Sequence, residues 1–377
     1  MKRAFATEGR VVVLDVPEPI LRAGEVLVTP AYSAISSGTE MHIISSTAKP
    51  ETTGTDTYPG PLAKPRPQIR NSGTRWDGPQ PHIVTPPLAA IGYSLAGTVR
   101  AVAPGILDIH PGDRVACSGN QCAVHAQQVA VPRNLVARVP DNVPLDHAAF
   151  VTLGSIAMNG LRRTGCRFGE TVAIFGLGLL GLIATQIARQ AGFYVLGLDL
   201  DERRVQQALA FGAHRAINPQ QEDPLEVALQ MTDGMGVDGV FLAVVTPSSE
   251  PLNLSFDICR QRGSVVGVGL FGMEIDRDRM YARDAIFYPA LAYGPGRYDP
   301  IYEEGNVDYP VGYVRWTENR NQAAFLRLLA EGKVDVAPLA PIRVPFAEAP
   351  HAYELLQRPD RPPTVLLTYG DNEVASS

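Results

Sequence analysis

Cysteine is scarce in this chain of 377 residues, which contains only four, and no two of them have Cys-x-x-Cys spacing. A disulfide framework and a structural zinc knuckle are therefore not expected. Basic runs are also missing, because 33 Lys and Arg residues are dispersed against 39 Asp and Glu residues. This balance argues against a nucleic-acid partner and against binding to an anionic membrane.

Long apolar runs are absent as well. No stretch approaches 18 uninterrupted apolar residues, and the first residues lack the apolar core of a signal peptide. We therefore expect a soluble, cytoplasmic protein. What the chain has in abundance is glycine (35 residues) and proline (32 residues), together with 45% hydrophobic residues. That combination predicts a globular chain with many strands, turns and glycine-rich loops.

Two sequence patterns divide the chain. Residues 1–150 contain short strand-like runs separated by Gly, Pro and Asp, which predicts a β-rich, barrel-like module. A stretch without periodicity interrupts this module at 45–88 and is interpreted as a lid or a disordered loop. Residues 151–290 alternate helical and strand-like segments, which predicts an α/β domain with a doubly wound parallel sheet. Residues 291–377 mix both patterns.

A glycine-rich motif carries the clearest chemical signal. An apolar strand at 172–175 leads into Gly176-x-Gly178-x-x-Gly181 and then into a helix that begins near Leu179 and Leu180. The glycines suit, in order, a tight turn, the close approach of a pyrophosphate and close packing of the helix on the sheet. The helix N-terminus would add free N–H groups and positive dipole.

The following strand ends in an acidic residue, Asp199, at the position where a carboxylate accepts hydrogen bonds from the adenosine ribose. This predicts NAD, although Arg204 nearby leaves NADP possible because it would screen a 2′-phosphate. The ends of the next two strands, at Val245 and Val268, complete the predicted cofactor site.

These features together resemble the medium-chain dehydrogenase/reductase superfamily. Further matching phrases are Gly24–Val28, the Gly-Asp-Arg-Val turn at 112–115 and Leu209–Ala213. The resemblance implies a GroES-like catalytic domain over 1–150, completed by 291–377, and a Rossmann domain over 151–290. It also implies a homodimer or homotetramer and a small-molecule substrate.

Zinc-dependent members of that superfamily carry metal-binding side chains where this chain has Ser37 and Tyr93, and Thr152–Gly154 offers no evident third ligand. No zinc is therefore expected. Other phrases, such as 92–97 and 293–299, resemble a zinc-lacking branch, namely the dehydrogenase half of two-domain oxidoreductases of bacterial sugar and polysaccharide pathways. The second module of those proteins is not expected here.

Candidate catalytic residues follow from the resemblance. Thr39 and His42 occupy the positions of the proton relay, Tyr93 is a hydrogen-bond donor for the substrate oxygen, and Glu40 would orient or take up a proton. Ser37 is included, although a space-filling role is favoured. Each of the others has an alternative role. Tyr93 would form a pocket wall, Thr39 would cap a helix, Glu40 would stabilise the helix N-terminus through the helix dipole, and His42 would contact the cofactor.

An aromatic and basic cluster forms the predicted substrate site, with a dimer contact or a stiff surface loop as equal alternatives. Its members are Tyr293, Arg297, Tyr298, Arg315 and Trp316.

The leading functional hypothesis is zinc-independent hydride transfer between NAD(H) and a hydroxyl or ketone of a hydrophilic small molecule, plausibly a sugar or cyclitol derivative. One alternative is reduction of an activated carbon–carbon double bond, as in quinone and enoyl reductases. Another is a nucleotide-sensing Rossmann protein without catalysis.

Overall fold

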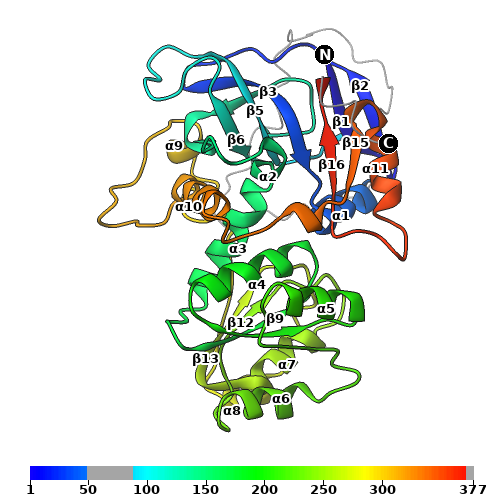
Figure 1. The fold of residues 1–377 in the computed structure, drawn as a ribbon, viewed down its shortest axis with the longest axis vertical. Helices are drawn as coiled ribbons and strands as arrows, with labels where there is room; N and C mark the ends of the chain where they lie inside the picture. The colour runs from blue at the N-terminus through cyan, green and yellow to red at the C-terminus, as the bar shows by residue number, and fades with distance from the viewer. Residues whose placement is uncertain (49–87, 371–377) are drawn as a thin grey trace, which may run out of the picture.

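The structure, a computed structural model, describes residues 1–48 and 88–370. A β-rich domain and a parallel α/β domain lie one above the other in Figure 1, with helix α3 (Val151–Arg163) running between them. The predicted fold class is confirmed. Among the described residues, no helix is both long enough and apolar enough to cross a membrane.

The β-rich domain contains a seven-stranded sheet in the order β15-β16-β3-β5-β6-β8, with β7 also paired to β3. Its strands are β3 (Glu25–Ala34), β5 (Ser94–Val102), β6 (Arg114–Ser118), β7 (Val129–Pro132), β8 (Val136–Arg138), β15 (Ile342–Pro345) and β16 (Val365–Thr368). Because β16 pairs antiparallel with β3, the C-terminal segment completes the N-terminal domain. A smaller sheet has the order β2-β1-β4, formed by β2 (Arg10–Asp15), β1 (Lys2–Thr7) and β4 (Ala89–Ala90).

The second domain has a six-stranded parallel sheet in the order β11-β10-β9-β12-β13-β14. The strands are β9 (Thr171–Phe175), β10 (Tyr194–Leu198), β11 (Arg215–Ile217), β12 (Val237–Leu242), β13 (Cys259–Gly267) and β14 (Ile286–Pro289). Alternate residues of β9 enter two different cores: Val172 and Ile174 pack with α3 and α4, whereas Ala173 and Phe175 pack with the residues of α6 and α7. Helices therefore cover both faces, as a Rossmann sheet requires.

Helices of this domain are α4 (Leu179–Gln190), α5 (Glu202–Ala210), α6 (Pro224–Met231), α7 (Glu250–Ile258) and α8 (Arg277–Ala282). The β-rich domain adds α1 (Ser37–Thr47), α2 (Leu145–Ala148), α9 (Pro300–Glu303), α10 (Glu318–Ala330), α11 (Ala349–Leu355) and the short 3₁₀ helices η1 (Arg133–Leu135), η2 (Ala337–Leu339) and η3 (Phe346–Glu348). Figure 1 shows α1 at the edge of the β-rich domain that faces the Rossmann domain.

Some local expectations change. The sequence pattern over 145–163 is helical throughout, but the structure divides this segment into α2 and α3 around Phe150, whose side chain is buried in the core. The interruption predicted from residue 45 begins later, since Ser45–Thr47 form the last turn of α1. The rest of that segment, including the proposed lid, lies outside the described residues.

Candidate functional site

A cleft of about 1470 Å³ lies where the two domains meet. The β-rich domain contributes the start of α1, Tyr93 and the segment 361–363. The Rossmann domain contributes the glycine-rich loop and the carboxyl ends of its parallel strands. Ligands of open parallel sheets bind at such ends, so this cleft is the candidate active site.

The glycine-rich loop forms one wall of the cleft. Gly176 has φ +85°, which lets the chain turn sharply after β9. An added Cβ at Gly181 would lie 1.9 Å from the Gly176 carbonyl oxygen, so α4 packs closely only because this residue has no side chain. Beside Gly178, in contrast, nothing lies within 4 Å of an added Cβ. This open space, next to the free N–H groups at the start of α4, fits the pyrophosphate of a dinucleotide.

Asp199 follows β10 at the adenosine end of the cleft. Its Oδ2 accepts a hydrogen bond from the Leu177 N–H (2.7 Å), and its Oδ1 accepts one from the Asp201 N–H (2.9 Å). The Arg204 guanidinium lies 3.5 Å from Oδ2. The carboxylate is thereby fixed to the glycine-rich loop, and both Asp199 and Arg204 line the cleft as predicted for cofactor-binding residues.

Arg361, which the sequence analysis did not single out, also lines this end of the cleft. Burial lowers its pKa, and the nearby charge of Arg204 acts in the same direction, while Asp199 opposes both. The only signal in the sequence was a basic residue shortly before the last strand, and many surface arginines meet that description. Val245, Val268, Leu179 and Leu180 line the cleft as well, in agreement with their predicted positions.

Tyr93 and Thr39 lie at the other end of the cleft. Tyr93 is 8% exposed, and its burial raises the pKa of the phenol to about 12. Hydrogen bonds with the Ser36 and Thr39 side chains lower that pKa in part, whereas the charge of Glu40 raises it. The phenol is therefore protonated at neutral pH and can donate a hydrogen bond. Thr39 itself is exposed to the cleft.

His42 and Ser37 are the other predicted catalytic residues that line the cleft. His42 lies one turn along α1 from Thr39 and is exposed. The Ser37 hydroxyl donates a hydrogen bond to the Pro363 carbonyl (3.2 Å). Ser37 thus ties the start of α1 to the segment before β16, which suits the structural role favoured for it.

Glu40 differs from its predicted catalytic position. It is completely buried and does not line the cleft. Its Oε1 accepts a hydrogen bond from the Ser36 N–H (2.8 Å), and its Oε2 accepts bonds from Tyr353 (2.5 Å) and from Nε2 of His125 (3.0 Å). The carboxylate is turned inward because these donors are there, so it anchors α1 to the domain core and does not face a substrate.

His125 extends this buried network. Its Nδ1 lies 2.7 Å from the Ser33 hydroxyl, which in turn lies 2.8 Å from the Tyr369 hydroxyl. A single tautomer, with the proton on Nε2, satisfies every member of the chain of hydrogen bonds. His125 is completely buried, so its role is structural.

The residues at the family's metal-ligand positions do not fit a zinc ion. Ser37 donates to a backbone carbonyl, the Thr152 hydroxyl donates to the Tyr93 carbonyl (2.8 Å), and Tyr93 holds its proton. Zn²⁺ in proteins prefers thiolate, imidazole and carboxylate ligands. Within residues 1–48 and 88–370, no group of three such side chains is placed to hold a metal ion.

The predicted substrate cluster lies outside the cleft and is divided in two. Arg297 is buried, where it donates to Glu303 (2.5 Å) and Asn120 (2.7 Å) and lies over the rings of Tyr293 and Tyr298. Trp316 lies elsewhere, between the guanidinium groups of Arg162 and Arg315, and lines a second cavity. None of the five predicted substrate residues lines the cleft. Arg297 is held instead by Glu303 and two tyrosine rings, and Trp316 is held by two arginines.

Comparison with known proteins agrees with this architecture. Residues 180–294 match the family described as zinc-binding dehydrogenase. An alcohol dehydrogenase of Geobacillus stearothermophilus is 30% identical over 222 residues, which are 51% of this chain and 64% of that protein. The (R,R)-butanediol dehydrogenase of Neisseria gonorrhoeae is 23% identical over 375 residues, covering 91% of this chain and 92% of that protein. These matches support assignment of this chain to the medium-chain dehydrogenase/reductase superfamily.

Solved structures share this fold. The alcohol dehydrogenase TADH from Thermus sp. ATN1 superimposes with a TM-score of 0.73 at 23% identity, over 98% of this chain and all of that chain. The similarity to this superfamily supports a nicotinamide cofactor, and the open space beside Gly178 fits the pyrophosphate of one. The first of the relatives above is matched over less than two thirds of its length.

Proposed function

We propose that this protein is an NAD(H)-dependent, zinc-independent oxidoreductase that interconverts a hydroxyl and a ketone on a hydrophilic small molecule. The observation that carries the proposal is the continuity of the cleft, which joins the glycine-rich loop and Asp199 at one end to Thr39, His42 and Tyr93 at the other. Serine, threonine and histidine side chains at the α1 end favour a polar substrate, plausibly a sugar or cyclitol derivative.

The cofactor would be held by the glycine-rich loop, with Asp199 at the adenosine ribose. When bound, it supplies or accepts the hydride. NAD(H) is favoured because Asp199 would repel a 2′-phosphate. Arg204 and Arg361 oppose this preference, since both line the same end of the cleft. Kinetic constants measured with NADH and NADPH decide between them, and a clear preference for NADPH contradicts the role given to Asp199.

Side chains of the cleft would stabilise the negative charge on the substrate oxygen and then protonate it. As hydride reaches a carbonyl carbon, the oxygen gains negative charge, which the Tyr93 and Thr39 hydroxyls stabilise by donating hydrogen bonds. The oxygen then takes up a proton through Thr39, and exposed His42 passes a proton in from solvent. The result is an alcohol and the oxidised cofactor. In the reverse direction the same groups carry the proton out.

The test follows NADH absorbance with a panel of keto-sugars, cyclitol ketones and enones. We expect turnover of a polar ketone, and we expect Tyr93→Phe to lower kcat by about 10²-fold while the KM for NADH stays unchanged. Because the pKa of Tyr93 is about 12, activity should show no loss from its ionisation between about pH 6 and pH 10. Tyr194→Phe, on an exposed tyrosine at the start of β10, is the matched control.

Other outcomes separate the alternatives. Turnover of enones alone would favour the double-bond reductase, and tight NADH binding without any turnover would favour the sensor. Zinc independence is tested by metal analysis of the active protein. One bound equivalent of zinc, together with loss of activity in a chelator, would contradict it.

A further inference from the structure

A second cavity, of about 530 Å³, lies on the opposite half of α3 from the cleft and shares no lining residue with it. Leu153 and Ile156, early in α3, line the cleft, whereas Met158, Leu161 and Arg162, later in the same helix, line the second cavity. Its volume lies within the range of small-molecule sites. Nothing in the proposed reaction uses it.

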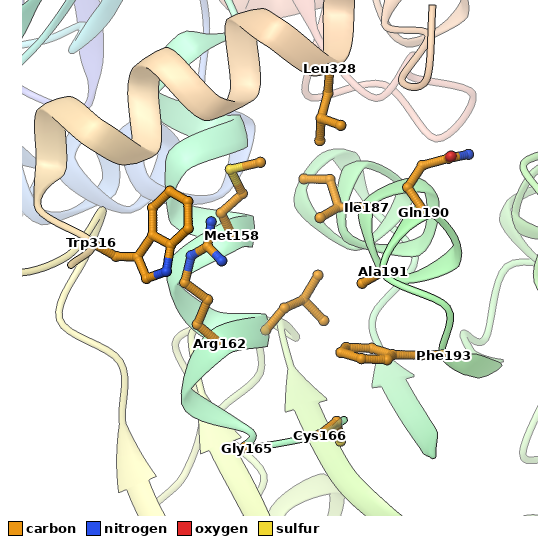
Figure 2. Close-up of a pocket in the computed structure, with 11 residues that line it drawn as sticks. Met158, Arg162, Gly165, Cys166, Ile187, Gln190, Ala191, Phe193, Trp316 and Leu328 are labelled. Carbon is orange, nitrogen blue, oxygen red and sulfur yellow. The ribbon is translucent and has the colours of Figure 1, made fainter. Parts of the chain in front are cut away.

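The walls of this cavity are mainly apolar and come from both domains, as Figure 2 shows. The β-rich domain supplies Leu328 of α10 and Trp316, which precedes that helix. The Rossmann domain supplies Ile187 of α4 and Phe193. Cys166 and Ala191 lie near Phe193. An apolar body placed here would contact both domains at once.

One side of the cavity is cationic. The Arg162 guanidinium lies 3.5 Å from the centre of the Trp316 ring, and that of Arg315 lies 4.0 Å from the same centre. Within the described part of the chain, the Arg162 guanidinium makes one hydrogen bond, from Nε to Asn321 Oδ1 (3.2 Å), an uncharged partner. Among the residues that the structure describes, no carboxylate lies within 4.0 Å of either arginine.

The two arginines also act on each other. Burial lowers the pKa of Arg162 to about 10, and the positive charge of Arg315 acts in the same direction. Arg162 is nevertheless protonated at neutral pH. Arg162 lines the cavity, and Arg315, which does not line it, adds a second positive charge beside the same indole ring. Because no described acid balances these charges, an anion would be stabilised on this side of the cavity.

We propose that this second cavity binds an amphipathic monocarboxylate, with its carboxylate on Arg162 and its apolar chain or ring between Met158, Ile187 and Leu328. With Nε engaged by Asn321, the two terminal nitrogens of Arg162 remain, and a pair of parallel N–H groups matches the two oxygens of a carboxylate. The apolar walls exclude a sugar or another fully polar ligand. The inference does not depend on the proposed reaction.

The experiment uses tryptophan fluorescence, because the chain has only two tryptophans, Trp76 and Trp316. In a Trp76→Phe background, emission comes from Trp316 alone. Decanoate, kept below its micelle-forming concentration, should give a saturable change in that emission. Decanol, which has the same chain without the charge, should bind at least about tenfold more weakly, as one lost charged contact implies.

Two variants locate the anion. Arg162→Gln should weaken decanoate binding at least about tenfold. Arg315→Gln should also weaken it, but by less. Arg163→Gln is the matched control, because the neighbouring Arg163 guanidinium lies over Tyr288 and does not line the cavity. The proposal is overturned if decanoate gives no saturable response, if decanol binds equally well, or if Arg162→Gln leaves the affinity unchanged. It is also overturned if sedimentation shows self-association that Leu328→Arg abolishes, because a second copy would then fill the cavity.

Discussion

The protonation state of a single buried acid in this protein depends on the charged groups around it. Glu318 is completely buried at the start of α10, near Glu303 and Arg297. Arg297 already pairs with Glu303, so one cation faces two carboxyl groups. Burial, followed by the charge of Glu303, raises the pKa of Glu318 to about 9. Glu318 is therefore a neutral acid at pH 7.

This shifted pKa predicts a pH dependence of stability. Because Glu318 binds its proton more tightly in the folded chain than in the unfolded one, stability is greatest below about pH 4.5 as far as this group is concerned and falls up to about pH 9. The slope due to this single group approaches about 1.4 kcal/mol per pH unit. Glu318→Gln, which copies the neutral acid, should remove that slope in urea unfolding measured across the range.

Glu304→Gln is the matched control for Glu318→Gln, because Glu304 is exposed. It should leave the pH dependence of the unfolding free energy as in the unaltered protein. If Glu318→Gln and the unaltered protein lose stability in parallel from about pH 5 to about pH 9, then Glu318 is ionised in the folded chain and our interpretation is wrong.

Single residues also show why part of the candidate site could not be predicted from the sequence. Glu40 lies beside Thr39 in the chain, and both have side chains suited to proton transfer. Their different positions depend on His125, which is 85 residues away, and on Tyr353, which is 313 residues away. Arg297 likewise has the composition of a substrate-binding residue, but its partner Asn120 is distant in sequence. Residue type indicates what a side chain can do, whereas distant partners decide whether it remains available.

At the scale of elements, local patterns were sufficient for the central strands of the Rossmann sheet but not for every strand. The strands β9 and β10 were predictable, because each is a short, mainly apolar run between turn signals, as is typical of a strand covered by helices on both faces. The glycine fingerprint was predictable for the same reason, since its function depends on spacing within one turn and one helix. The strands β1 and β14 were not predicted, because each is defined by pairing with a neighbour rather than by a strong local pattern.

In the turn between β9 and α4, we expect two glycine substitutions to have different effects, one on cofactor binding and the other on stability. Gly178→Ala places its methyl group in the open space of the cleft, and its backbone at φ −73° accepts any residue. Folding should be nearly unchanged, while NADH binding should weaken by about tenfold or more. Gly181→Ala would force the helix away from Gly176 and should lower the unfolding free energy by about 1–3 kcal/mol.

Urea unfolding and NADH titration measure both glycine effects. Gly312→Ala, at another open position away from the cleft, is the control and should change neither quantity. Equal affinity for NADH in the Gly178→Ala variant and the unaltered protein would show that no phosphate approaches this loop.

At the scale of the whole molecule, the cleft is closed by contacts between segments that are far apart in the chain. Ser37 donates to the Pro363 carbonyl, and Arg203 donates to the Pro359 carbonyl (3.2 Å) from the Rossmann domain. The segment before β16 therefore touches α1 on one side and α5 on the other. A cofactor in the cleft would be held by both domains, so its binding should stabilise them together.

We therefore predict that NADH raises the melting temperature of the whole chain, and that Arg361 carries part of this effect. At a concentration about 100 times its Kd, a ligand specific for the folded state adds about 2.7 kcal/mol. Arg361→Gln should leave the melting temperature without ligand nearly unchanged, because its main neighbour among charged groups is the like-charged Arg204. It should reduce the shift in melting temperature caused by NADH. It should reduce the shift caused by NADPH still more, since a 2′-phosphate would lie closest to Arg361 and Arg204.

Arg358→Gln, exposed in the same segment and outside the cleft, is the control and should behave as the unaltered protein does. Equal shifts in Arg361→Gln and Arg358→Gln with both cofactors would mean that the segment before β16 does not reach the bound cofactor, and that the Rossmann domain alone holds it.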